Sequence, residues 1–304
     1  MIHILGAGAM GCLWAAHLQT SLTPEQLCFI STRTPSQASV NFEIQSPFLP
    51  YINSHKQFTA PIRKSLYTPD KTNIILLCTK SYDALPALQN LKNQIGSEVM
   101  FVLFQNGLGS QHQILKEFPN NPVFAAVTTE GVNKTATQIV HAGQGTTSIG
   151  PLNKPAQNQT SLKTCYDLLT HKGLEVKAEE NIWPSLWKKL AINCAINPFT
   201  AVLNCPNGQL THEMYFTSKW TLLRRELSNM LNAANVSSNE AELEELVFNV
   251  IESTKNNISS MLQDVRQNKQ TEIEDINGFA FRYLKSQGLE YKTNEKLWNE
   301  VKGC

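Results

Sequence analysis

A glycine-rich hexapeptide near the beginning of the chain constrains its fold more than any other feature. Residues Gly6–Gly11 read GAGAMG, directly after the apolar run Ile2–Leu5 and before the apolar segment LWAAHL. The expected order is therefore strand, tight glycine turn and helix. Glycines there allow positive φ and close approach of a pyrophosphate, and the helix N-terminus offers N–H groups and a favourable dipole. This context, more than the G-x-G-x-x-G spacing alone, predicts dinucleotide binding over an ordinary structural turn.

The end of the next expected strand bears on which dinucleotide binds. Gln26–Ser31 is a short apolar run, and the residue that follows such a strand meets the adenosine ribose. An acidic residue there favours NAD, whereas an arginine suits a 2′-phosphate. The chain has Arg33 at this point and no acid before Glu43. We therefore predict NADPH as the cofactor, with a solvated surface arginine as the alternative interpretation of Arg33.

Two later strands end in polar side chains. Asn73–Thr79 and Val99–Gln105 are continuous apolar runs typical of buried parallel strands, followed by Lys80 and by Asn106. Open α/β sheets bind ligands at the carboxyl ends of their strands, so both residues are candidate ligand contacts. A surface lysine and an Asn-Gly turn are the ordinary alternatives. We expect a further strand at Pro122–Thr129 and one glycine-punctuated strand, His141–Gly150, to close the domain.

The pattern changes near residue 180. Pro151–Gln159 has the composition of a surface loop, Ser161–Lys172 is expected to be a helix, and Leu174–Ala178 is the last strand-like run. Beyond it the pattern is nearly all helical. We predict an α/β Rossmann-type dinucleotide-binding domain over residues 1–180, followed by an all-α domain over residues 181–304.

The segment Ser185–Gly208 contains an unusual polar stripe. Its apolar residues recur at helical spacing after Pro184, and Lys189, Asn193 and Asn197 stand four residues apart on one face. One amine and two carboxamides are costly to bury unless something polar lies against them. From the spacing alone, a water-facing stripe and a cleft for a small oxygen-rich anion are equally good interpretations.

A second polar set lies in Asn256–Phe279. Ser260 and Asp264 are four residues apart, and Glu272 falls in the same sector if one helix continues that far. By spacing alone, surface polar residues of a mixed-charge helix are the slightly better interpretation.

Composition excludes several classes of protein. The chain has 304 residues, a formal net charge of +1 and 41% hydrophobic residues, which predicts an ordinary two-domain protein without nucleic-acid or membrane-surface partners. Its seven cysteines contain no C-x-x-C pair and its seven histidines form no ligand cluster, so we expect no disulfide framework and no metal site. We find no signal peptide or membrane span and expect a cytoplasmic location.

The chain resembles the ketopantoate reductase family along nearly its whole length. The likeness is carried, in order, by GAGAMG, TKSYDA, FQNGLGS, HAGQGTTSIG, LWKKLAINCAINPFTAVLNCPNG, SSMLQD and TEIEDING. Several ordered motifs across both halves are far more specific than the glycine loop alone. The resemblance implies an NADPH-binding Rossmann domain, a helical domain, and an active site in the cleft between them.

The resemblance also assigns roles to individual residues. Lys189 matches the family's catalytic lysine. The cofactor contacts implied are Gly6, Ala7, Gly8, Ala9, Met10, Gly11, Arg33, Lys80, Asn106, Glu272 and, through its main chain, Val132. The substrate contacts implied are Asn106, Asn193, Asn197, Asn207 and Ser260. Glu274 stands where the family more often has aspartate, a departure that leaves the expected activity intact.

The implied reaction is reduction of a 2-keto acid, 2-dehydropantoate, to pantoate in pantothenate biosynthesis. Lys189 would stabilise the charge that develops on the carbonyl oxygen and act as general acid, and an unperturbed lysine pKa keeps it protonated at neutral pH. The alternatives are a related 2-keto-acid or 3-hydroxyacid dehydrogenase and a non-catalytic NADP-binding sensor. We expect a small-molecule substrate as the partner, and a homodimer is compatible with the sequence.

Overall fold

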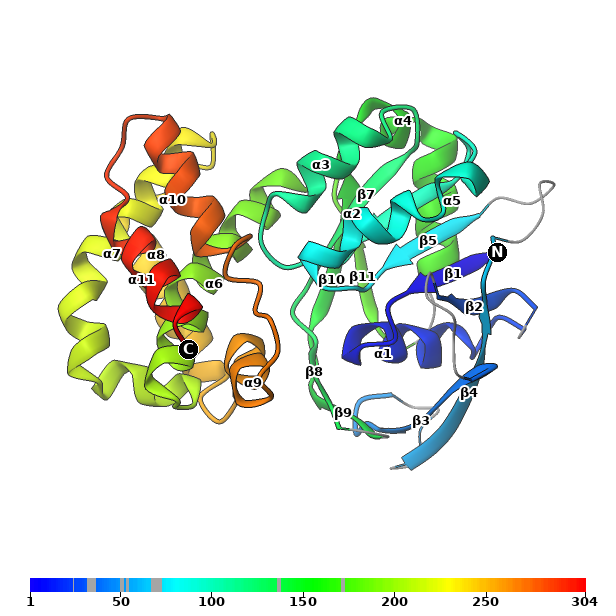
Figure 1. The fold of residues 1–304 in the computed structure, drawn as a ribbon, viewed down its shortest axis with the longest axis horizontal. Helices are drawn as coiled ribbons and strands as arrows, with labels where there is room; N and C mark the ends of the chain where they lie inside the picture. The colour runs from blue at the N-terminus through cyan, green and yellow to red at the C-terminus, as the bar shows by residue number, and fades with distance from the viewer. Residues whose placement is uncertain are drawn as a thin grey trace. The chain divides into compact units, whose positions relative to one another are not determined.

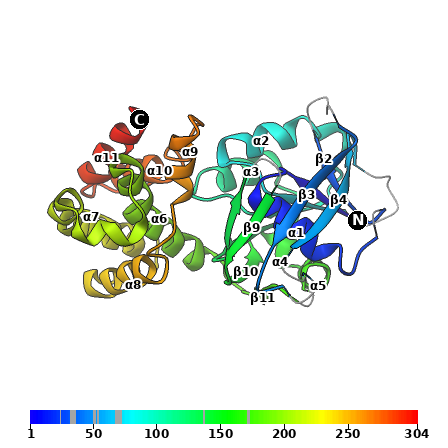
Figure 2. The same cartoon turned by 90° about the horizontal axis from the view of Figure 1, so that it is seen from below.

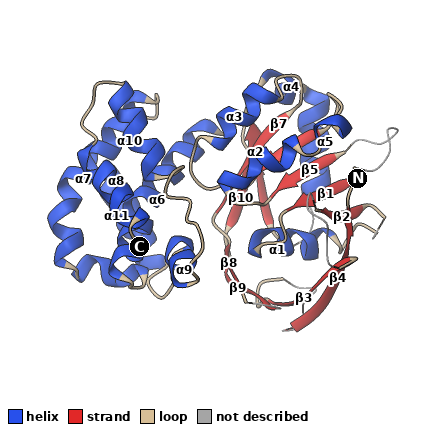
Figure 3. Cartoon of the chain, viewed as in Figure 1, coloured by secondary structure: helices blue, strands red, loops and turns tan. Residues whose placement is uncertain are grey.

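The chain forms two compact units (Figures 1 and 3). The structure, a computed structural model, describes residues 1–23, 25–31, 37–49, 52, 55–66, 73–135, 138–170 and 173–304. One unit comprises Met1–Gln105 and Ser110–Ile182, and the other comprises Asn106–Gly109 and Trp183–Cys304. The segment Asn106–Gly109, which the sequence places in the first domain, thus belongs by its contacts to the second unit.

The first unit is built on one twisted sheet of eleven described strands in the order β11-β10-β7-β6-β5-β1-β2-β4-β3-β9-β8. Its central strands, β2, β1, β5, β6 and β7, pair in parallel and are almost wholly buried, as expected for apolar runs covered on both faces. Figure 2 shows β3 and β4 beside each other, where they pair antiparallel. The strands are β1 (Ile2–Leu5), β2 (Leu27–Ile30), β3 (Ser39–Gln45), β4 (His55–Arg63), β5 (Ile74–Leu77), β6 (Met100–Leu103), β7 (Val123–Thr128), β8 (Gly131–Lys134), β9 (Gln138–Gly143), β10 (Thr146–Pro151) and β11 (Glu175–Ala178).

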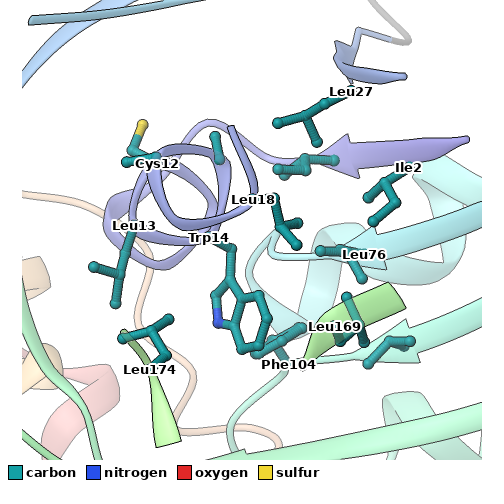
Figure 4. Close-up of a cluster of buried hydrophobic side chains, with 14 of the residues drawn as sticks. Ile2, Cys12, Leu13, Trp14, Leu18, Leu27, Leu76, Phe104, Leu169 and Leu174 are labelled. Carbon is teal, nitrogen blue, oxygen red and sulfur yellow. The ribbon is translucent and has the colours of Figure 1, made fainter. Parts of the chain in front are cut away.

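Helix α1 (Ala9–Leu18) is enclosed by the core of this unit. Trp14 is fully buried and its ring lies 5.2 Å from the Phe104 ring, with Leu13 and Leu174 nearby (Figure 4). This packing holds the start of α1, and the glycine loop before it, in a defined place. The other helices of the unit are α2 (Ser81–Gln89), η1 (Lys92–Gln94), α3 (Ser110–Glu117), α4 (Lys154–Gln157) and α5 (Gln159–Leu169).

Two local expectations for this unit were wrong. His141–Gly150 is not one strand but the end of β9 and most of β10, with Gln144 and Gly145 between them. A Cβ at Gly145 would lie 2.4 Å from the backbone of Thr129, so glycine permits this close passage of two chain segments. The expected loop over residues 151–159 contains the short helix α4, which Asn153 caps through its side chain.

The second unit is all-α from residue 183 to the end, a stretch that the structure describes completely. It contains α6 (Trp183–Leu203), η2 (Asn207–His212), α7 (Met214–Ala233), α8 (Glu240–Ser253), α9 (Ser260–Arg266), α10 (Asn277–Ser286) and α11 (Lys292–Lys302). The expected fold class, an α/β domain followed by an all-α domain, is confirmed. Among the described residues, no helix has both the length and the apolar character needed to cross a bilayer.

The continuous helix considered for Ser260–Glu272 is not formed. Helix α9 ends at Arg266, and Asn268 adopts a φ of 50° in the left-handed region, a conformation that stops a helix. Ser260 and Asp264 share α9, whereas Glu272 lies in the turn that precedes α10. Helical spacing therefore does not place Glu272.

Candidate functional site

In the glycine loop, packing requires two of the glycines and leaves open space at a third. A Cβ at Gly6 would lie 2.6 Å from the backbone nitrogen of Thr79, and a Cβ at Gly11 would lie 2.0 Å from the carbonyl oxygen of Gly6. Packing of the loop against β5 and α1 therefore requires these two glycines. A Cβ at Gly8 would meet nothing closer than 3.8 Å, so the protein's own packing makes no such demand there.

Gly8 is also the N-cap of α1, where it supplies no side-chain cap, and the first turn of α1 contains no acidic residue. Backbone N–H groups and the positive end of the helix dipole are thus directed at the space beside Ala7, Ala9 and Met10. Such a cradle fits a phosphate anion.

A hollow of about 420 Å³ adjoins the loop at the carboxyl ends of the parallel strands. It is lined by Gly6 and Ala7, by the end of β2 at Ile30 and Ser31, and by one face of α2 that includes Asp83. The buried hydroxyl of Thr79, also in the lining, has no hydrogen-bond partner in the part of the chain that the structure describes. A buried hydroxyl without a partner calls for a ligand or water, and the hollow fits the adenosine half of a dinucleotide.

The other expected cofactor contacts of the first unit differ in how the structure places them. Lys80 is the N-cap of α2, three residues after β5 ends at Leu77, and so lies near the strand end where the sequence predicts it. Val132 lies on β8, where the register of pairing with β9 shifts between Gly131 and Val132. A bulge leaves main-chain groups unpaired, which is compatible with a main-chain contact. Arg33 lies outside the described residues.

Lys134 on β8 was not identified from the sequence. Its Nζ donates a hydrogen bond to the carbonyl oxygen of Ala7 and lies 3.9 Å from the Cys12 sulfur. Burial raises the pKa of the Cys12 thiol to about 11, and the nearby Lys134 acts to lower it. A lysine on a short polar strand carries no local signal, because only the pairing of β8 beside α1 brings it to the glycine loop.

In the second unit, α6 runs unbroken through Lys189, Asn193 and Asn197, so the three residues share one face of the helix. Asn197 is buried and the other two are half-buried. A stripe facing open water is therefore the poorer description. Burial lowers the pKa of Lys189 from its usual value to about 8, although the negative charge of Glu272 acts to raise it. The expectation of an unperturbed lysine was wrong, because the sequence did not show how deeply the amine is enclosed.

Glu272 links this stripe to Asn106. Glu272 as a residue is 5% exposed, and the Asn106 Nδ2 lies 3.3 Å from its Oε2. The Leu108 N–H donates to the Asp275 carbonyl at 2.9 Å, which ties the segment after β6 to the turn before α10. Gly107, at a φ of +77°, has room for no side chain, since a Cβ would lie 2.2 Å from that same carbonyl oxygen. The Asn-Gly pair is thus part of this cluster and not only a turn.

The two remaining expected substrate contacts lie at the edges of helices. Asn207 is buried at the start of η2, where its Nδ2 donates to the Thr254 hydroxyl at 2.9 Å, and its Oδ1 has no partner among the described residues. Ser260 is exposed at the first position of α9. Its neighbour Ser259 is buried, caps α9, and lies 2.7 Å from the Thr200 hydroxyl of α6.

The comparisons with known proteins cover both units. The family model "Ketopantoate reductase PanE/ApbA" matches residues 2–154, and "Ketopantoate reductase PanE/ApbA C terminal" matches residues 181–304. The 2-dehydropantoate 2-reductase of Vibrio cholerae is 31% identical over 99% of this chain and 96% of its own length. The enzyme of the same name from Pyrococcus abyssi is 29% identical over 99% of this chain and 97% of its own.

Two solved structures illustrate the shared fold. A probable 2-dehydropantoate 2-reductase from Bacillus subtilis superimposes with a TM-score of 0.78 at 23% identity, covering 99% of each chain. A D-mandelate dehydrogenase in a ternary structure with NADH and anilino(oxo)acetate superimposes with a TM-score of 0.85 at 20% identity, covering 100% of this chain and 97% of its own. At these identities the superpositions speak for the fold.

Proposed function

Because this chain belongs to the ketopantoate reductase family, a family of NADPH-binding oxidoreductases, we propose that it reduces 2-dehydropantoate to pantoate with NADPH. The observation that best supports this proposal is the half-buried Lys189, whose pKa is lowered to about 8 beside Glu272, on a face shared with two carboxamides. An amine that titrates near neutral pH is suited to proton transfer.

Most of the proposed cofactor contacts lie in the first unit. Bound NADPH supplies the hydride for the keto carbon. The Gly6–Gly11 loop and the N-terminus of α1 hold the phosphates, and the hollow beside Thr79 holds the adenosine. Arg33 recognises the 2′-phosphate, and Lys134 adds positive charge beside the loop. The further cofactor contacts of the proposal are Lys80, Asn106, Val132 and Glu272.

Lys189 has two roles. As negative charge develops on the carbonyl oxygen, the ammonium stabilises it, and a proton of Nζ then passes to that oxygen to give the hydroxyl of the product. Lys189 is left neutral and regains its proton from solvent. Glu272 keeps the protonated form of Lys189 populated, because its negative charge opposes the effect of burial.

The carboxamides and hydroxyl of the second unit orient the substrate without adding charge. Amide groups donate to carboxylate and keto oxygens and accept from a hydroxyl, which matches the polar groups of a hydroxylated 2-keto acid. Loss of one contact misplaces the carbonyl and lowers the rate. The residues assigned to this role are Asn106, Asn193, Asn197, Asn207 and Ser260. A place in pantothenate biosynthesis, a cytoplasmic location and a homodimer complete the proposal.

The experiment that tests the function follows the loss of NADPH absorbance with ketopantoate, with NADH and a panel of other 2-keto acids alongside. We expect rapid turnover of ketopantoate with NADPH and little with NADH. Lys189→Ala should lose the great majority of turnover yet still bind NADPH in a fluorescence titration. Near-normal turnover by this variant would refute the role of Lys189, and preference for another keto acid would refute the proposed substrate.

A further inference from the structure

Pro198 lies inside helix α6 and deprives one carbonyl of that helix of its usual donor. In an α-helix the carbonyl of residue i accepts from the N–H of residue i+4, and proline has no N–H. The affected residue is Cys194, which is buried. Cys194 directly follows Asn193 and lies one turn before Asn197. The unpaired carbonyl therefore falls in the turn that carries the proposed substrate amides.

Asn277, the first residue of α10, supplies the missing donor. Its Nδ2 donates to the Cys194 carbonyl oxygen at 3.2 Å and to the Asn294 Oδ1 at 3.0 Å. The Asn277 side chain is 0% exposed, and its Oδ1 has no partner among the described residues. Both amide hydrogens are thus used. Burying a carboxamide completely is costly when its own oxygen has no partner. We therefore take the hydrogen bond that Asn277 donates to the Cys194 carbonyl as the role of this side chain.

The orientation of Asn277 is set by a buried carboxylate. Glu226 of α7 accepts from the Asn294 backbone N–H at 2.9 Å and from the Asn294 Nδ2 at 2.8 Å through Oε2, and from the Thr293 N–H at 2.7 Å through Oε1. Because the Asn294 amide nitrogen must face the carboxylate, its oxygen faces Asn277. A continuous chain of hydrogen bonds therefore runs from α7 through α11 and α10 to the backbone of α6.

We propose that Asn277 is a positioning residue for the reduction. By pairing the Cys194 carbonyl, it holds α6 in one conformation at Pro198, where helices otherwise bend variably. The side chain of Asn197, beyond Cys194, is thereby fixed relative to Lys189 and Asn193, which precede Cys194. Asn277 acts through the backbone of α6 and touches no substrate. This inference rests on the proposed function.

A double-mutant cycle tests the inference. Asn277→Leu keeps the approximate shape of the side chain and removes the donor, whereas Pro198→Ala restores an N–H that can pair the Cys194 carbonyl within the helix. We expect Asn277→Leu to lower kcat/KM for the keto acid about tenfold or more, with NADPH affinity unchanged. Pro198→Ala alone should stay near wild type, and the double variant should regain most of the lost kcat/KM.

The matched control is Leu284→Val, a buried change on the same helix that leaves these hydrogen bonds in place. It should lower the melting temperature without lowering kcat/KM of the folded protein. A merely structural Asn277 would behave like this control, with no kinetic rescue by Pro198→Ala, and that result overturns the proposal.

If Asn277→Leu does not fold, Asn277→Ala, which removes the donor without adding a buried charge or apolar bulk, replaces it in the cycle. If folding appears only with Pro198→Ala, a kcat/KM near wild type in that double variant supports the proposal, whereas a low kcat/KM or failure to fold in both backgrounds overturns it. Failure of the proposed function is recognised separately, because wild-type protein would then not turn over ketopantoate. In that case kcat/KM of the variants in the double-mutant cycle is measured with the keto acid that the wild type does reduce.

Discussion

Raising the pH through 8 should switch off the reductase, because the proposed acid loses its proton there. With a Lys189 pKa of about 8, about nine-tenths of the amine is protonated at pH 7, about one-tenth at pH 9 and about one-hundredth at pH 10. The value of kcat/KM should follow these fractions. An unperturbed lysine would remain almost fully protonated at pH 9, so the two cases differ about tenfold at that pH.

The measurement is kcat/KM for the keto acid from about pH 6 to about pH 10, which reports the pKa of the essential acid in the free enzyme. Two variants assign the alkaline limb to Lys189. Lys189→Arg places a group there that stays charged throughout this range, so any residual activity should lack the limb. Glu272→Gln removes the charge that raises the Lys189 pKa, so the limb should move to lower pH.

A wild-type profile that stays flat to pH 10 would refute the reasoning, because burial would then not have lowered the lysine pKa. The same alkaline limb in Lys189→Arg would refute the assignment of the limb to Lys189, because it would show that another group titrates. An unchanged alkaline limb in Glu272→Gln would show that the Glu272 charge does not influence the pKa of Lys189. The role of Lys189 as the acid would be unaffected by that result.

Three further predictions concern the first unit. Gly6→Ala should lower the free energy of unfolding in urea by ~1–3 kcal/mol, because its φ is +109° and its Cβ would lie 2.6 Å from a backbone nitrogen. Gly8→Ala should leave the free energy of unfolding within ~0.5 kcal/mol of wild type. Gly8→Ala should nevertheless lower the affinity for NADPH about tenfold in a fluorescence titration. Equal losses of stability in Gly6→Ala and Gly8→Ala would contradict the assignment of Gly6 to packing and Gly8 to cofactor binding. Lys134→Met should weaken NADPH severalfold by removing the charge beside Ala7, whereas the exposed Lys163→Met should not; identical affinities would remove Lys134 from the cofactor site.

The sequence by itself determined what depends on consecutive residues. The strand, turn and helix around Gly6–Gly11 follow from local backbone geometry, and that element is present where the sequence predicts it. The shared face of Lys189, Asn193 and Asn197 follows from the period of one helix, which the structure continues without a break. Both patterns need only the chain's own repeat, so no knowledge of packing is required.

The tertiary structure decided what depends on residues far apart in the chain. Glu272 reaches Asn106 and influences Lys189 from a turn that helical spacing misplaced, since Asn268 ends the preceding helix. Lys134 meets the glycine loop only because β8 lies beside α1. The pKa of Lys189 is set by burial and by a neighbour from another element. The donor that pairs the Cys194 carbonyl likewise comes from another element, through Asn277. These are properties that no run of consecutive residues contains.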